Sequence, residues 1–121
     1  MINALWVFLG CGLGGVLRYA AVALSALLFG ARFPYGILLV NVTGSLVMGY
    51  VFARFEGSEV MKPLLLVGLL GGYTTFSSFS IDTLKLIESG QMMSAIANIV
   101  LSVGLCLLAV WVGCTLSKHV F

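Results

Sequence analysis

The stretch Gly68-Leu-Leu-Gly71-Gly72-Tyr73-Thr74-Thr75-Phe76-Ser77-Ser78-Phe79-Ser80 interrupts the third long apolar segment of this chain. The segment begins near Leu64 as an ordinary apolar span and then meets two glycines and two adjacent threonines, which are weak helix formers. In hydrocarbon an unpaired backbone N–H or C=O costs several kcal/mol, so a broken span survives only where protein or a water-filled cavity satisfies the freed groups. The stretch therefore predicts a broken third helix that lines an ion or solute site.

The composition indicates an integral membrane protein. Of the 121 residues, 61% are hydrophobic and 8% are charged, whereas about 25% of the residues in soluble domains are charged. Since each span needs roughly 20 apolar residues, we expect a single domain over residues 1–121, an all-α bundle of four transmembrane helices without a removable signal peptide. The spans are expected at residues 4–29, 35–55, 64–88 and 93–117.

The cysteines and the charges exclude several classes of protein. Cys11, Cys106 and Cys114 lie in apolar segments without metal-ligand spacing, so we interpret them as small buried hydrophobes and expect no disulfide. The six basic residues are too sparse for a nucleic-acid patch. No Ser-His-Asp or Cys-His arrangement and no paired carboxylates lie in the spans, so we do not expect an enzyme.

The first span combines glycines with an unusual cation. The Gly10-x-x-x-Gly14 spacing is typical of close helix packing in lipid. Arg18 lies deep in the same span, where a guanidinium usually faces a cavity or a partner, although it can also snorkel to a nearby interface.

Polar residues in the second and fourth spans have two possible roles. The side-chain amide of Asn41 can join helices or present its N–H groups to a passing anion, and the residues alone leave both open. In the fourth span a polar stripe recurs every four residues on one helix face, as either a track beside a pore or an interhelical ladder. Its members are Ser94, Asn98, Ser102 and Cys106.

The basic residues give almost no bias in membrane orientation. Four spans place Arg54, Lys62 and Lys118 on one side and Arg32 and Lys85 on the other. A chain with so little bias can insert either way round, and isologous two-fold pairing is the commonest assembly. We therefore predict an antiparallel, dual-topology homodimer.

The polar inventory at membrane depth favours an anion. It consists of a basic residue, amides, hydroxyls and the rings of Phe76 and Phe79, whose edges carry the positive end of the aromatic quadrupole. Weak, multiple sites of this kind suit conduction. The alternative, a proton-coupled small multidrug-type exporter, would want an acid in the first span, where this chain has Arg18.

Three motifs in order resemble the Fluc (CrcB) fluoride channels over essentially the whole chain. They are Gly14-Gly15-Val-Leu-Arg18-Tyr19, Gly36-Ile-Leu-Leu-Val-Asn41-Val-Thr-Gly44 and Gly71-Gly72-Tyr-Thr74-Thr75-Phe76-Ser77-Ser78-Phe79-Ser80. The resemblance implies a multi-pass protein of the bacterial plasma (inner) membrane that passively exports toxic fluoride from the cytoplasm. It also implies two antiparallel pores in a dual-topology dimer embedded in the lipid bilayer.

The resemblance further implies roles for individual residues. A structural sodium ion at the dimer centre would be held by the backbone carbonyls of Gly71 and Thr74. The ion pathway would be formed by Asn41, Phe76, Phe79, Ser77, Ser78, Ser102 and, near an aqueous vestibule, Arg18. Two positions depart from the family pattern: Ser78 replaces a common Thr, and Cys106 occupies a track position where a hydroxyl is common. A thiol is the weaker donor, so conduction is expected to be slower if the track must be continuous.

Overall fold

Four helical runs traverse the length of the molecule in the computed structural model, which describes residues 2–120. In chain order the elements are α1 (Ile2–Phe29), α2 (Tyr35–Arg54), the π-helical segment η1 (Lys62–Leu70), α3 (Gly71–Tyr73), α4 (Phe76–Glu88) and α5 (Met92–His119). Counting Lys62–Glu88 as one run, the described residues contain 4 helices that are long and apolar enough to cross a membrane. The prediction of an all-helical protein with four spans is therefore confirmed.

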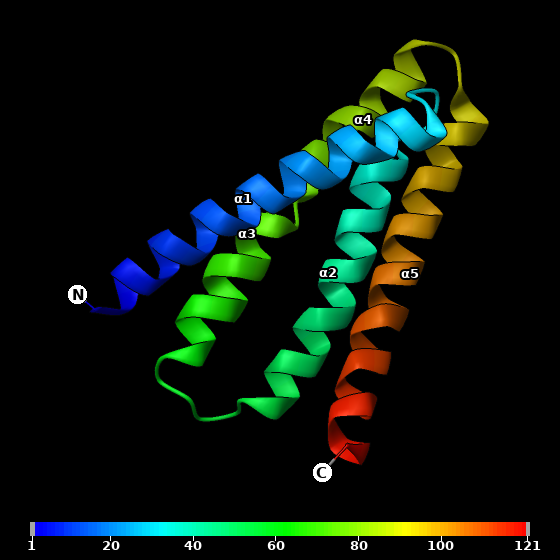
Figure 1. The fold of residues 1–121 in the computed structure, drawn as a ribbon. Coiled ribbons are helices and arrows are strands. Elements are labelled where there is room, and N and C mark those ends of the chain that lie inside the picture. The colour runs from blue at the N-terminus through cyan, green and yellow to red at the C-terminus, as the bar shows by residue number, and fades with distance from the viewer. Residues whose placement is uncertain (1, 121) are drawn as a thin grey trace.

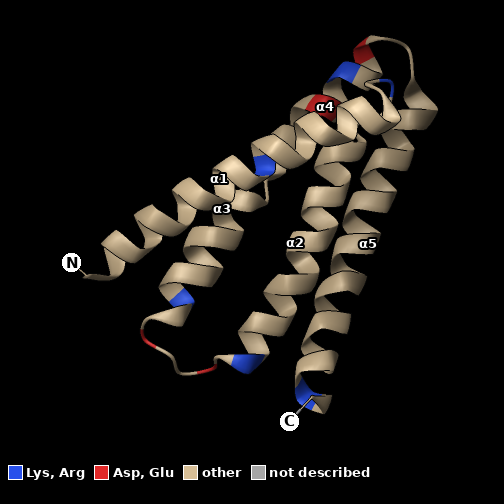
Figure 2. Ribbon diagram, in the orientation of Figure 1, with Lys and Arg blue, Asp and Glu red and all other residues tan. Residues whose placement is uncertain are grey.

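The loops and the termini lie at two opposite ends of the molecule. Figure 1 shows both termini and the loop between α2 and η1 at one end, and the α1–α2 and α4–α5 loops at the other. Charged residues gather at these ends, apart from one basic position in the middle of α1 (Figure 2). That position is Arg18, the only Lys or Arg in α1.

Two helix pairs form most of the tertiary contacts, α2 with α5 and α1 with η1. Glycines allow both pairs to approach closely. A Cβ placed on Gly10 or Gly14 would collide with the backbone of η1, and a Cβ on Gly49 would collide with the backbone of Val110 in α5. The close packing predicted from the Gly10-x-x-x-Gly14 spacing is thus confirmed, and η1 is the partner.

The third run leaves helical geometry at the two threonines. Thr74 (φ −86°, ψ 156°) and Thr75 (φ −156°, ψ 121°) are extended. The glycine pair stays helical, although the glycines and the threonines were both expected to weaken the helix. A Cβ on Gly72 would lie 2.6 Å from the carbonyl oxygen of Cys11, so this glycine serves the contact with α1.

The three cysteines are free thiols in the structure, as expected. The prediction of burial is wrong for Cys11, which is exposed, whereas Cys106 and Cys114 are half-buried. The physical reason is that lipid, unlike water, is itself apolar, so an apolar side chain is as favourable on the lipid-facing surface as inside the bundle. A small hydrophobe in a span therefore need not face the helix bundle.

Candidate functional site

The break between α3 and α4 is fastened to α2 by Asn41. The Asn41 Nδ2 group donates to the carbonyl oxygen of Thr75 at 2.9 Å, and Asn41 Oδ1 accepts from the Thr75 N–H at 2.8 Å. Both backbone groups of an extended residue are thereby satisfied, as membrane depth requires. The sequence alone did not decide whether Asn41 joins helices or lines a pore. The structure shows that its amide does join helices.

The same clamp frees a carbonyl group on α3. In a continuous α-helix the N–H of Thr75 would be donated to the carbonyl oxygen of Gly71. Here that N–H is donated to Asn41 Oδ1, while the Thr74 N–H is donated to the carbonyl oxygen of Leu70 at 2.9 Å. The carbonyl of Gly71 is therefore left for another partner.

Thr75 also begins α4. Its Oγ1 accepts from the N–H of Ser78 at 3.1 Å, which is the N-cap arrangement. The Thr75 hydroxyl also donates to Ser78 Oγ at 3.2 Å and lies 3.2 Å from Ser77 Oγ. Ser77 and Ser78 are thus both held at the start of the helix.

The two phenylalanines of α4 form a pair with very different exposure. Their ring centroids are 5.2 Å apart and the rings are tilted by 48°. Phe76 is 75% exposed in the protomer, whereas Phe79 is 8% exposed. Phe76 therefore presents its ring outside the four-helix unit, and Phe79 supports it from within.

A groove lies between α2, the break and α5, and we call it the central groove. It encloses about 380 Å³ and is lined by Asn41, Gly44, Ser45, Met48, Thr74, Thr75, Phe76, Ser102, Val103, Cys106, Leu107 and Val110. No residue of this lining is charged. The groove brings together three of the predicted pathway residues, Asn41, Phe76 and Ser102, from three different helices.

Arg18 and Ser78 meet in a second cavity on the α1 side. This cavity encloses about 480 Å³ and is lined by Gly15, Arg18, Tyr19, Val22, Ala23, Ile37 and Ser78. Arg18 is half-buried rather than fully exposed. The structure thus separates this pair from the central groove within one protomer, and Ser77 lines neither cavity.

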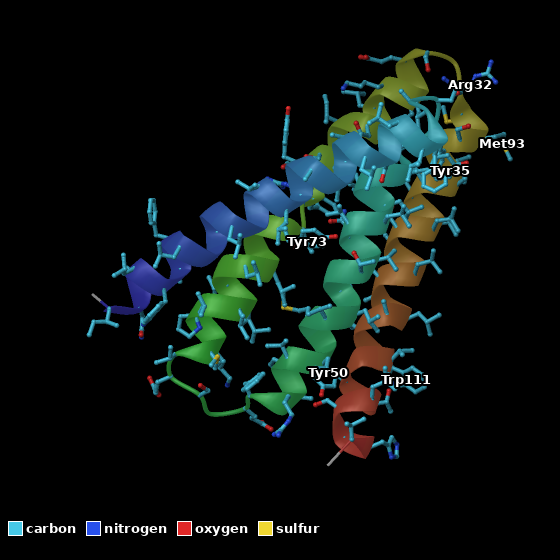
Figure 3. All side chains as sticks on the ribbon, in the orientation of Figure 1. Arg32, Tyr35, Tyr50, Tyr73, Met93 and Trp111 are labelled. Atoms are coloured by element: carbon cyan, nitrogen blue, oxygen red, sulfur yellow. The ribbon has the colours of Figure 1, made fainter. Side chains whose placement is uncertain are left out.

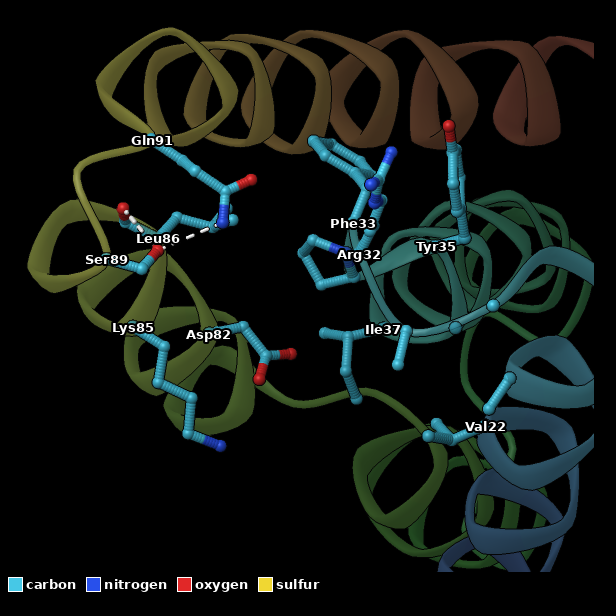
Figure 4. A pocket seen from close by; sticks show the side chains of 15 residues that line it. Val22, Arg32, Phe33, Tyr35, Ile37, Asp82, Lys85, Leu86, Ser89 and Gln91 are labelled. Carbon is cyan, nitrogen blue, oxygen red and sulfur yellow. Dashed lines mark hydrogen bonds between the residues drawn. The ribbon is translucent and has the colours of Figure 1, made fainter.

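A third cavity of about 450 Å³ opens at the loop end that carries Arg32 and Gln91. In Figure 4 the side chains of Asp82 and Gln91 point into it from α4 and from the start of α5. Gln91 Nε2 donates to Ser89 Oγ at 3.0 Å, and Ser89 Oγ donates to the carbonyl oxygen of Leu86 at 3.1 Å. This cleft is polar and mixed in charge, in contrast to the uncharged central groove.

Two positions that bond the break to α2 were not singled out as sites from the sequence. Thr75 is the partner of the Asn41 clamp, but nothing in the chain order links residues 34 positions apart. Tyr73 projects from α3, and its hydroxyl lies 3.1 Å from Thr43 Oγ1 on α2 (Figure 3). The one sequence signal is that Thr43 and Gly44 lie close to Asn41 in the chain. This spacing indicates that this part of α2 packs against the break.

The arrangement suits a weakly held anion better than a covalent reaction. The central groove is lined by the Asn41 amide, by hydroxyl groups and by the Phe76 ring, without a nucleophile beside a base. Within residues 2–120, no group of three or more His, Cys, Asp or Glu side chains could hold a metal ion. Oxygen ligands for a cation at the break would come from the backbone or from hydroxyl groups.

Comparisons with known proteins agree on one family. A family model described as "CrcB-like protein, Camphor Resistance (CrcB)" matches residues 5–114. A relative from Coxiella burnetii (strain Dugway 5J108-111), named "Fluoride-specific ion channel FluC", is 50% identical over 123 residues, covering 98% of this chain and 99% of the relative. A relative of the same name from Aeromonas salmonicida (strain A449) is 46% identical over 89% of this chain and 91% of its own length. A third, from Shewanella halifaxensis (strain HAW-EB4), is 43% identical over 93% of this chain and 94% of its own length.

Proposed function

This chain belongs to the CrcB family, and from that premise we propose that it is a fluoride-specific ion channel that lets toxic fluoride leave the cytoplasm passively. Relatives named for this ion match nearly the full chain. The structural observation that supports the proposal most strongly is the uncharged central groove at the break, where Asn41, Phe76 and Ser102 meet. Neither the family nor the relatives support a proton-coupled multidrug exporter.

An anion that crosses the groove gives up part of its hydration shell and contacts several weakly binding protein groups instead. A fixed cation in the path would trap the ion, whereas N–H groups, hydroxyls and ring edges hold it loosely enough for it to leave. Asn41, Phe76 and Ser102 line the groove. We propose that Phe79, Ser77 and Ser78 belong to the same ion path outside the groove. Arg18, in the separate cavity that it shares with Ser78, raises the local concentration of anions near this path.

We propose that the working unit is an antiparallel homodimer of dual topology. One end of the protomer carries Arg54, Lys62 and Lys118, and the other carries Arg32 and Lys85. The two ends therefore differ little in positive charge, so the positive-inside rule favours neither orientation strongly. The groove and the 75% exposed Phe76 would face lipid in a lone protomer. A second copy would cover these polar groups, which hydrocarbon cannot satisfy.

A structural sodium ion at the dimer centre fits the backbone of the break. The carbonyl of Gly71 has lost its helical donor to Asn41, and Thr74 is extended, so both carbonyls can serve a cation. Hard cations take oxygen ligands. Bound there, sodium would offset the negative ends of these carbonyls and join the subunits. Replacing sodium by N-methylglucamine should increase dissociation of the detergent-solubilised dimer, and unchanged dissociation would remove this proposal.

The chain is a multi-pass membrane protein, and we propose the bacterial inner membrane as its location. The membership of an ion-channel family also fits the expectation that it is not an enzyme.

Fluoride efflux from liposomes tests the function. Purified protein reconstituted under an outward fluoride gradient, with valinomycin to carry potassium as counterion, should release fluoride to an external electrode. Efflux should continue when the proton gradient is collapsed, because the channel is passive. Transport that follows the proton gradient and carries organic cations would instead indicate an exporter.

A further inference from the structure

A polar cleft lies at the loop end of the molecule, between the α1–α2 loop and the end of α4, and we call it the loop-end cleft. It encloses about 450 Å³, a volume typical of small-molecule sites, which span about 300–1,000 Å³. None of the residues that we place in the ion path lines it. The conduction of an anion therefore does not account for the side chains that meet there.

The side-chain amide of Gln91 is held so that its oxygen faces the cleft. The Ser89 hydroxyl has one proton and donates it to the carbonyl oxygen of Leu86, which can only accept. Ser89 Oγ therefore accepts from Gln91 Nε2, at 3.0 Å. This bond fixes which end of the amide faces Ser89 and leaves Oε1 outside it. In Figure 4 the Gln91 side chain points into the cleft, and no hydrogen bond is drawn to its oxygen.

Asp82 provides a second acceptor in the same cleft. This residue is half-buried, and its carboxylate points into the cleft from α4 (Figure 4). None of the lining residues drawn there forms a hydrogen bond with it, although Arg32 and Lys85 also line the cleft. An ionised carboxylate can only accept hydrogen bonds. Two acceptors, one of them charged, thus face one cleft from α4 and from the N-cap of α5.

A primary ammonium group complements these two acceptors. It carries a positive charge and several N–H donors, so it can bond to Asp82 and to Gln91 Oε1 at the same time. The bond to Asp82 is charge-assisted and therefore stronger than a neutral one. The two cations of the lining, Arg32 and Lys85, suit an anionic phosphate on the same ligand. The cleft therefore matches a zwitterion that carries both an amine and a phosphate.

We propose that the loop-end cleft binds the headgroup of phosphatidylethanolamine, with the ammonium at Asp82 and Gln91 and the phosphate toward Arg32 and Lys85. The cleft lies at one end of the membrane-spanning helices, which is the depth of the lipid headgroups. Basic pockets between transmembrane helices bind such headgroups. The rest of the lining includes apolar side chains that suit the glycerol and the first acyl carbons, namely Val22, Ala26, Ile37 and Leu86.

Lipid binding to the detergent-solubilised protein, measured by native mass spectrometry, tests this proposal. Palmitoyl-oleoyl lipids with ethanolamine, choline or glycerol headgroups share the phosphate and the acyl chains, and only the first has ammonium N–H donors. The protein should bind the ethanolamine lipid about tenfold more tightly than the other two, as one charge-assisted hydrogen bond predicts. N-methylated forms should bind progressively more weakly, because each methyl group replaces one N–H donor. Equal affinity for the three lipids would overturn the proposal.

Substitutions in the cleft separate the two halves of the headgroup. Asp82→Asn removes the charge at nearly constant size and should abolish the preference for the ethanolamine lipid. Arg32→Gln should weaken the binding of all three lipids and keep the preference. Glu88→Gln is the matched control and should bind as the wild type does, because Glu88 is an acid of α4 that does not line the cleft.

Two results with these variants would contradict the proposal. They are a preference that survives in Asp82→Asn and lipid binding that Arg32→Gln leaves unchanged. If Asp82→Asn fails to assemble, the series of N-methylated lipids on the wild-type protein decides.

A soluble headgroup distinguishes a lipid from a free amine. O-Phosphoethanolamine carries the same ammonium and phosphate without acyl chains, so at the concentration of the lipid it should not displace the lipid. Displacement would show that the cleft takes a soluble amine phosphate and would overturn the lipid assignment. None of these measurements involves transport, so a protein that binds the lipid but passes no fluoride would count against the proposed function alone.

Discussion

Replacing Asn41 by Leu should destabilise the folded protein by about 2–6 kcal/mol. Leucine has a similar volume but cannot hydrogen-bond, so both backbone groups of Thr75 lose their partner. Thr75 is only 8% exposed and lies in the middle of a span, where water does not reach it freely. Each buried group left unsatisfied costs about 1–3 kcal/mol, and two such groups give the stated range.

The assay is reversible unfolding in mixed micelles, with sodium dodecyl sulfate as the denaturant and helical circular dichroism as the signal. Ser45→Ala is the control, because Ser45 lines the same groove from α2 and is half-buried. Its free energy of unfolding should stay within about 0.5 kcal/mol of the wild type. Fluoride efflux should fall in Asn41→Leu, since the break that positions Phe76 is no longer held. If Asn41→Leu is as stable as Ser45→Ala, Asn41 does not hold the break and the reasoning is refuted.

Three further substitutions test the site and the packing. Phe76→Ile should lower fluoride efflux at least about tenfold. The free energy of unfolding of the protomer should change by less than about 0.5 kcal/mol, because the ring is 75% exposed in the protomer. A large loss of protomer stability would instead mark Phe76 as a core residue. Gly14→Ala should destabilise by about 1–3 kcal/mol because its Cβ would meet the backbone of η1, whereas Gly15→Ala, with open space at its Cβ, should be neutral in the same unfolding assay. Thr75→Val should cost about 1 kcal/mol by removing the cap of α4, and Thr75→Ser should restore most of it; equal stability of the two would show that the cap is not formed.

The architecture follows from the sequence because the bilayer leaves few choices. Four apolar segments of sufficient length must become four helices, and the glycines at positions 10 and 14 already indicate a close helix contact. The location of the break was harder to predict. Helix propensity pointed to the glycines as well as the threonines, but Gly72 is needed for close contact with α1 and remains helical.

The roles of the polar residues could not be read from spacing. A period of four residues places Asn98 and Ser102 on one face of α5, and this holds for both a pore track and an interhelical ladder. The partner decides, and the partner of Asn98 is Thr83 on α4. Asn41 is a similar case, since its amide bonds a backbone 34 residues away. Tertiary contacts, rather than the local sequence, determine which hydrogen-bonding groups remain free for an ion.

The ratio of fluoride to chloride efflux from liposomes tests the central claim most directly. Wild-type protein, reconstituted with equal internal fluoride and chloride and with valinomycin and external potassium-free buffer, should release fluoride rapidly and retain chloride. The Phe76→Ile protein, prepared in parallel, should release little of either ion. Equal release of both ions by the wild type, or release of neither, would contradict the account.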